Sequence, residues 1–136
     1  MNQACLVMID DNPGDIELVR IAFEMRETTV DLRTAGGGEQ GIALLARLEG
    51  ENLIPRLVLL DLNMTRVSGF EVLAFIRGRT ALAAMPVIVF SSSTAPRDRE
   101  RSITLGATEF MAKPDGLDAL LVLVDRLGVY VTRPTP

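Results

Sequence analysis

Short apolar runs alternate with amphipathic stretches along the chain. Three of the runs, 5–9, 57–60 and 87–90, are apolar throughout, and two weaker runs follow the same rhythm at 30–35 and 109–112. Uninterrupted apolar runs of this length are typical of strands in a parallel sheet that is covered on both faces. The pattern therefore predicts five parallel strands.

The stretches between these runs carry apolar residues at helical spacing. Asn12-Pro13 is a helix-start signal, and Gly78 and Gly106 are stop signals. The chain is thus predicted to be an α/β protein with a doubly wound five-stranded sheet. Three stretches place their apolar residues on one helical face: Ile16, Val19, Ala22 and Phe23; Ile42, Leu45 and Leu48; Val72, Leu73 and Ile76.

The last predicted helix differs from the others because residues 119–124 are six consecutive apolar residues. Such a helix is apolar on every side, and only one side can meet the sheet. It needs a second burial surface. Either residues 128–136 fold back over it or another protein chain covers it, and the sequence leaves both open.

Composition narrows the class of protein. A chain of 136 residues fits one domain, which we place at 1–128 with a C-terminal tail at 129–136. A net charge of −4 argues against nucleic-acid binding, and no His and one Cys exclude Ser-His-Asp triads, most zinc enzymes and an internal disulfide. There is no signal peptide and no apolar run of about 18 residues, so we expect a cytoplasmic protein that does not enter a membrane.

Polar residues follow the predicted strands. The first strand ends in Asp10-Asp11, the third in Asp61, the fourth in Ser91 and the fifth in Lys113. Ligands of doubly wound sheets bind outside the carboxyl ends of the strands. If the strand order is 2-1-3-4-5, the three carboxylates crowd into one crevice.

Repulsion between three carboxylates so close together raises the pKa of at least one of them, or else a cation binds and compensates the charge. Oxygen ligands without His or thiolate favour Mg²⁺ or Mn²⁺, so we interpret Asp10, Asp11 and Asp61 as a metal site. A single aspartate at a strand end often only caps the next helix. Three that converge are harder to explain in that way.

Lys113 is the only lysine among 14 basic residues. A chain that otherwise uses arginine has reason to keep lysine where a compact, flexible point charge is needed. Chance is the alternative. Because Pro114 follows, Lys113 is expected to be extended and to reach along the strand end toward the crevice.

These segments resemble the receiver domains of two-component response regulators, the CheY-like family. The resemblance covers nearly the whole chain and implies a flavodoxin-like sheet in the order 2-1-3-4-5 with five helices. It is carried by LVMIDDNPGD as the acidic pair, LVLLDLNM as the phosphoacceptor segment, VIVFSSS as the strand with the switch hydroxyl and FMAKP as the lysine-proline turn.

The resemblance also implies roles for the residues. Asp61 would accept a phosphoryl group from a sensor histidine kinase, and Mg²⁺ would be held by Asp10, Asp11, Asp61 and the carbonyl of Asn63. Lys113 and Ser91 would contact the phosphoryl group, and Phe110 would be the switch aromatic. Without the resemblance, we would interpret Ser91 as a residue whose hydroxyl forms a hydrogen bond with the backbone, and Phe110 as a residue of the hydrophobic core.

The family resemblance implies a signalling module that promotes its own phosphorylation, not an enzyme acting on a separate substrate. Its output would pass through a downstream protein partner. Further similarity to single-domain regulators associated with bacterial phytochrome kinases implies a bacteriophytochrome as kinase and a homodimer through the last helix. A phosphorelay intermediate is an alternative role.

Two other functions compete. An aspartate-nucleophile phosphatase also uses a strand-end Asp with Mg²⁺, but it needs a second Asp two positions on, where this chain has Asn63. A flavodoxin-type FMN module needs a phosphate loop after the first strand, where Asp10 and Asp11 would repel phosphate. The chain also lacks the proline that many receivers carry after the phosphoacceptor segment, and reads Asn63-Met64-Thr65-Arg66 there.

Overall fold

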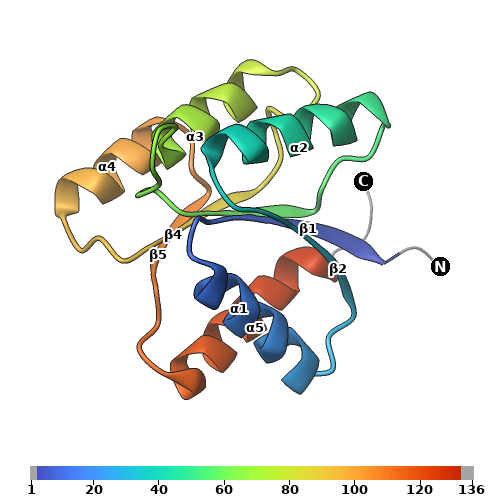
Figure 1. The fold of residues 1–136 in the computed structure, drawn as a ribbon, viewed down its shortest axis with the longest axis vertical. Coiled ribbons are helices and arrows are strands. Elements are labelled where there is room, and N and C mark those ends of the chain that lie inside the picture. Colours follow the sequence, from blue (N-terminus) through green and yellow to red (C-terminus); the bar gives the residue numbers. More distant parts are fainter. Residues whose placement is uncertain (1–2, 133–136) are drawn as a thin grey trace.

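A computed structural model describes residues 3–132 and shows one five-stranded parallel sheet (Figure 1). The strand order is β2-β1-β3-β4-β5, as the resemblance implied. Each strand begins and ends within one residue of its predicted run. The strands are β1 (Ala4–Ile9), β2 (Val30–Ala35), β3 (Leu57–Leu60), β4 (Val87–Ser91) and β5 (Glu109–Ala112).

Five helices alternate with the strands and cover both faces of the sheet. In Figure 1, α1 and α5 lie side by side below the sheet, and α2, α3 and α4 lie above it. They are α1 (Pro13–Met25), α2 (Gly38–Gly50), α3 (Gly69–Gly78), α4 (Pro96–Thr104) and α5 (Leu117–Val131).

Alternate residues of the central strands enter two separate cores. In β1, Val7 and Ile9 pack with α2 and α3, whereas Leu6 and Met8 pack with α1 and α5. Strands β1, β3 and β4 are buried almost throughout. This explains why their sequences are uninterrupted apolar runs: in a doubly covered sheet both faces of a strand are core.

The last helix buries one face and exposes another. Its buried residues include Leu120, Leu123 and Leu127, while Val122 is 59% exposed and Val129 is 63% exposed. Within residues 3–132, no segment covers that second face. Helix α5 continues to Val131, past the boundary at residue 128 that we predicted for the receiver, and residues 133–136 lie outside the described part.

No helix within residues 3–132 is long and apolar enough to cross a lipid bilayer.

Candidate functional site

The crevice at the carboxyl ends of β1 and β3 is built by strand register. Ile9 is paired with Leu60, so the next residues, Asp10 and Asp61, leave the sheet side by side. The Asp61 amide donates to the Ile9 carbonyl at 2.9 Å, and the Asp10 amide donates to the Ala35 carbonyl at 3.0 Å. Both carboxylates are buried, with Asp10 fully inaccessible and Asp61 4% exposed.

Asp11 completes a group of three carboxylates. One oxygen from each of Asp10, Asp11 and Asp61 lies within 4.8 Å of the others. Asp11 is more exposed than its two neighbours and accepts a hydrogen bond from the Thr65 backbone amide at 3.3 Å. The predicted convergence of the three carboxylates is confirmed.

The loop after Asp61 packs closely against the first residue of α3. The Gly69 amide donates to the Leu62 carbonyl at 3.0 Å, and a Cβ at Gly69 would lie 2.3 Å from the Asp61 carbonyl oxygen. Only glycine fits this approach without displacing backbone. Ser68 and Glu71 form a capping box at the start of α3, which fixes the far end of the loop.

Lys113 reaches the carboxylates from β5. Its backbone amide donates to the Ser91 carbonyl at 2.8 Å, which places the residue at the end of β4. Its Nζ lies 3.0 Å from Asp10 Oδ2 and 3.7 Å from Asp61 Oδ1. The sequence prediction that the only lysine faces the acidic crevice is confirmed.

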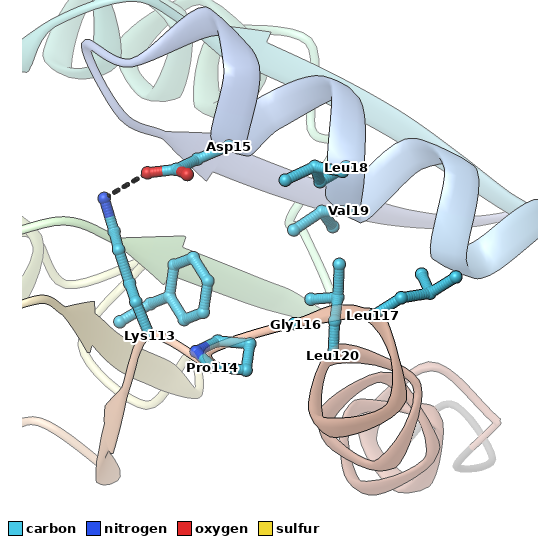
Figure 2. A pocket seen from close by; sticks show the side chains of 9 residues that line it. Asp15, Leu18, Val19, Lys113, Pro114, Gly116, Leu117 and Leu120 are labelled. Atoms are coloured by element: carbon cyan, nitrogen blue, oxygen red, sulfur yellow. Dashed lines mark hydrogen bonds and ion pairs between the residues drawn. The ribbon is translucent and has the colours of Figure 1, made fainter.

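A fourth carboxylate, Asp15, joins the group. Its Oδ2 accepts a hydrogen bond from Lys113 Nζ at 2.7 Å, shorter than either of the other two ion pairs of that lysine (Figure 2). Asp15 lies in the first turn of α1, where the Asn12 side chain caps the helix. Sequence reasoning missed it; the signal was an acidic residue in the first turn of a helix that starts at the crevice.

Burial and mutual repulsion raise the carboxylate pKa values. Desolvation and then the charge of Asp10 raise the pKa of Asp61 to about 6, against the opposing effect of Lys113 and the Asn63 backbone amide. Desolvation also raises the pKa of Asp10, although the Asn12 amide and Lys113 oppose it. The site thus holds more negative charge than its lysine can compensate.

The Lys113 ammonium stays charged in this setting. Burial by itself lowers the pKa of Lys113, but the hydrogen bond with Asp15, the close ion pair with Asp10 and further attraction from Asp61 raise it overall. The side chain is 16% exposed. The ammonium is therefore a fixed positive charge directed at three carboxylates.

Residues 6–125 match the family model of the response regulator receiver domain. The chain belongs to this family. Among curated relatives, the probable methanogenesis regulatory protein FilR2 of Methanothrix harundinacea is 30% identical over 92% of this chain and 81% of its own length. The transcriptional regulatory protein KdpE of Mycobacterium tuberculosis is 34% identical over 96% of this chain. The chain spans 52% of that regulator, about half its length.

Solved structures of similar receivers share the fold over nearly their full length. The Mn²⁺-bound form of response regulator Rcp1 is 27% identical with a TM-score of 0.83, and the coverage is 97% of both chains. The phosphorylated cyanobacterial phytochrome response regulator RcpA is 26% identical, with a TM-score of 0.84 over 96% of this chain and 94% of that one. The bacteriophytochrome response regulator AtBRR is 28% identical, with a TM-score of 0.76, covering 100% and 99%.

The remaining predicted site residues of this receiver lie in β4, in β5 and in the loop after Asp61. Ser91 is fully buried at the end of β4, and its Oγ accepts a hydrogen bond from the Ser93 amide at 3.0 Å. Phe110 is half-buried in β5, paired with Val89, and packs against the core above the sheet. Asn63 is exposed in the loop that follows Asp61.

The carboxylate group of this receiver fits a divalent cation. Asp10 Oδ2 and Asp61 Oδ1 are buried and accept no hydrogen bond from the described residues, although both face Lys113. Buried carboxylate oxygens without donors are costly unless a cation satisfies them. An all-oxygen donor set is the type that Mg²⁺ and Mn²⁺ prefer.

Proposed function

We propose that this receiver accepts a phosphoryl group on Asp61 from the phosphohistidine of a sensor histidine kinase. The observation that carries the proposal is the convergence of Asp10, Asp11 and Asp61 with Lys113 at the carboxyl ends of the strands. An aspartate nucleophile needs charge neutralisation on both the acceptor and the transferred group. This crevice holds a lysine and a set of cation ligands for that purpose.

In the proposed transfer, a carboxylate oxygen of Asp61 forms a bond to phosphorus while the phosphorus–nitrogen bond of the phosphohistidine breaks. The imidazole nitrogen keeps the electron pair of the broken bond and takes a proton. The transferred group adds charge of about −1.5 to −2. Lys113 pairs with that charge, and the Ser91 hydroxyl donates to a phosphoryl oxygen.

Mg²⁺ is the proposed cofactor, held by Asp10, Asp11, Asp61 and the carbonyl of Asn63. Bound there, the ion would neutralise the transferred oxygens and lower the repulsion between acceptor and donor. The Mn²⁺-bound form of Rcp1 supports this assignment. So do the two buried carboxylate oxygens that accept no hydrogen bond from residues 3–132.

The proposed output is a change of surface shape. When Ser91 and Lys113 turn toward the phosphoryl group, Phe110 takes the space that they vacate. Phe110 is adjacent in the sheet to Val89, two residues before Ser91, which places it within reach of such a change. A downstream protein partner would bind the altered surface.

A phytochrome-type histidine kinase is the proposed donor, because RcpA and AtBRR are phytochrome response regulators that share this fold over nearly their whole length. Action as a single-domain regulator, with 1–128 as the receiver, is part of the proposal. The proposed assembly is a homodimer through the exposed face of α5. The cytoplasmic location stays a prediction.

Mass spectrometry after incubation with Mg²⁺ and acetyl phosphate tests the proposal. We expect one phosphoryl group on the peptide that contains Asp61, and none at that position in Asp61→Asn or without Mg²⁺. Asp31→Asn is the matched control, because it removes a surface carboxylate at the opposite end of the sheet and should be modified normally. Equal modification of Asp61→Asn at residue 61, or of a different residue in wild type, would contradict the assignment.

The phosphatase alternative is not favoured by the site. A phosphatase of this kind needs a proton donor two positions after the nucleophile, and the amide of Asn63 cannot supply one.

A further inference from the structure

We propose that Asp15 is a positioning residue that holds the Lys113 ammonium on the α1 side of the crevice and thereby weakens the binding of a phosphoryl group at Asp61. The inference rests on the proposed function of Asp61. It assigns to the first turn of α1 a control over how strongly the receiver holds its phosphorylated state.

The distances around Lys113 carry the first step. Among the described residues, Nζ makes its shortest contact, 2.7 Å, with Asp15 Oδ2 and its longest ion pair, 3.7 Å, with Asp61 Oδ1. The contact with Asp15 is a hydrogen bond as well as an ion pair. The ammonium is thus drawn toward α1 and away from the residue that we propose to be phosphorylated.

The anchoring of Asp15 carries the second step. The Asn12 side chain accepts hydrogen bonds from the amides of Gly14 at 2.9 Å and Asp15 at 3.3 Å, and Pro13 starts the helix. A capped first turn holds the backbone of Asp15 in place. Asp15 can therefore follow Lys113 toward Asp61 only as far as rotation of its own short side chain allows.

The surroundings of the pair carry the third step. Figure 2 shows the Asp15–Lys113 contact at the mouth of a pocket that is lined mainly by Leu18, Val19, Pro114 and Leu120. The Phe90 ring also lines it, with Lys113 Nζ 5.6 Å from its centroid. The Lys113 side chain is 16% exposed and that of Asp15 27%. Partial burial among apolar groups makes the ion pair harder to break than one in open solvent.

These steps give the direction of the effect. We expect a phosphoryl group on Asp61 to draw the ammonium toward the Asp61 side of the crevice, which lengthens or breaks the 2.7 Å contact with Asp15. The phosphoryl group is then bound less tightly, because losing the contact between Asp15 and Lys113 costs free energy. Asp15→Asn keeps a hydrogen-bond acceptor but removes the charge, so Lys113 becomes free to move.

The test uses the full chain with Mg²⁺ and beryllofluoride, a phosphoryl mimic whose binding is measured by ¹⁹F NMR titration. We expect Asp15→Asn to bind beryllofluoride about threefold to tenfold more tightly than wild type. The effect should disappear when Asp15→Asn is made together with Lys113→Met, because a positioning residue acts through its partner. Glu17→Gln is the matched control: it removes another α1 carboxylate, which pairs with Arg20, and should leave binding unchanged.

Unchanged or weaker binding by Asp15→Asn would overturn the inference. So would an equal gain with and without Lys113, since that result would mean that Asp15 acts only as a nearby negative charge. The proposed function fails separately, if wild type does not bind beryllofluoride or if Asp61→Asn binds it equally well.

A second measurement observes the Lys113 ammonium directly. It tests the inference even if Lys113→Met abolishes beryllofluoride binding and the double variant cannot be compared. Because Lys113 is the only lysine in the chain, ¹⁵Nζ labelling gives a single resonance. In Asp15→Asn without beryllofluoride, we expect this resonance to move toward its position in the wild-type beryllofluoride complex. No movement, or movement away from that position, would overturn the inference.

Discussion

The Thr65 backbone amide donates a hydrogen bond to Asp11 Oδ2 at 3.3 Å and joins the loop after β3 to the end of β1. The two residues are 54 positions apart in the chain. This loop carries Asn63, whose carbonyl we propose as a cation ligand. Asp11 is thus a proposed cation ligand, and it also anchors the loop that carries Asn63, a second proposed ligand.

The first prediction concerns Asp11. Asp11→Asn removes a ligand charge but leaves the buried Asp10 and Asp61 in place, so we expect Mg²⁺ affinity to fall about tenfold or more with the fold intact. Isothermal titration calorimetry measures the affinity, and the far-ultraviolet circular dichroism spectrum checks the fold. Asp31→Asn should bind Mg²⁺ as wild type does. Equal affinity for Asp11→Asn would remove Asp11 from the proposed ligand set.

The second prediction concerns Gly69. Its alanine variant places a Cβ 2.3 Å from the Asp61 carbonyl oxygen, so the backbone must shift and we expect a loss of about 2 to 4 kcal/mol in the free energy of unfolding. Because the shifted carbonyl belongs to Asp61, phosphorylation by acetyl phosphate should also slow. Urea denaturation and the phosphorylation time course measure the two effects.

Gly78→Ala is the matched control for Gly69, since it lies at the other end of α3 and an added Cβ there would meet no atom within 4 Å. We expect it to be neutral or to stabilise by about 0.5 to 1 kcal/mol through lower backbone entropy of the unfolded chain. A Gly69→Ala variant as stable as Gly78→Ala would contradict the close approach.

The third prediction is a pH dependence of stability without metal. The pKa of Asp61 is about 6 in the folded chain against 3.8 as its ordinary value, so the folded state binds more protons than the unfolded state between these values. The contribution of Asp61 to the free energy of unfolding therefore falls as pH rises from about 4 to above 6. Relative to wild type, Asp61→Asn should gain about 2 to 3 kcal/mol across this range.

Urea denaturation in EDTA, at intervals from pH 4 to pH 8, measures that difference. A difference for Asp61→Asn that stays constant across this range would show that the Asp61 pKa is not raised. Saturating Mg²⁺ should reduce the gain, because a bound cation removes the repulsion that disfavours the charged carboxylate.

The fourth prediction concerns the proposed homodimer. Val122 and Val129 lie one heptad apart on the exposed face of α5, so Val122→Asp and Val129→Asp should shift sedimentation toward the monomer without disturbing the core. Ile54→Asp, a change at a residue of 41% exposure in the loop between α2 and β3, is the control. A wild-type monomer, or a dimer that both variants leave intact, would exclude this face as the interface. Substitution of Leu123 is unsuitable, because that side chain is 6% exposed and belongs to the core.

The strands and the main site could be predicted because they depend on local pattern and on strand ends. Uninterrupted apolar runs mark strands that are buried on both faces, and the residues that follow them, Asp10, Asp61 and Lys113, meet wherever those strands are close neighbours. The same reasoning located the group formed by Asp10, Asp11 and Asp61. It required no knowledge of loops or of helix orientation.

Other contacts could not be predicted because they depend on packing or on loop conformation. The contact of Asp15 with Lys113 requires the position of α1 over the sheet, which its packing with α5 sets. The Thr65–Asp11 hydrogen bond requires a loop in which Arg66 adopts a φ of 70°, a conformation that arginine seldom takes. Which side of α5 is exposed could not be predicted either, because residues 119–124 are all apolar and give the helix no polar side.

The strand order has a mechanical consequence. Asp10 and Asp61 follow β1 and β3, each of which is hydrogen-bonded to two neighbouring strands. Phe110 lies in β5 and Lys113 follows it, and β5 is one of the two edge strands of the sheet, with β4 as its single neighbour. An edge strand gives up fewer ladder hydrogen bonds when it shifts than an internal one does. The rigid interior of the sheet thus carries the proposed acceptor, and the more easily displaced edge carries the residues that we propose to respond to it.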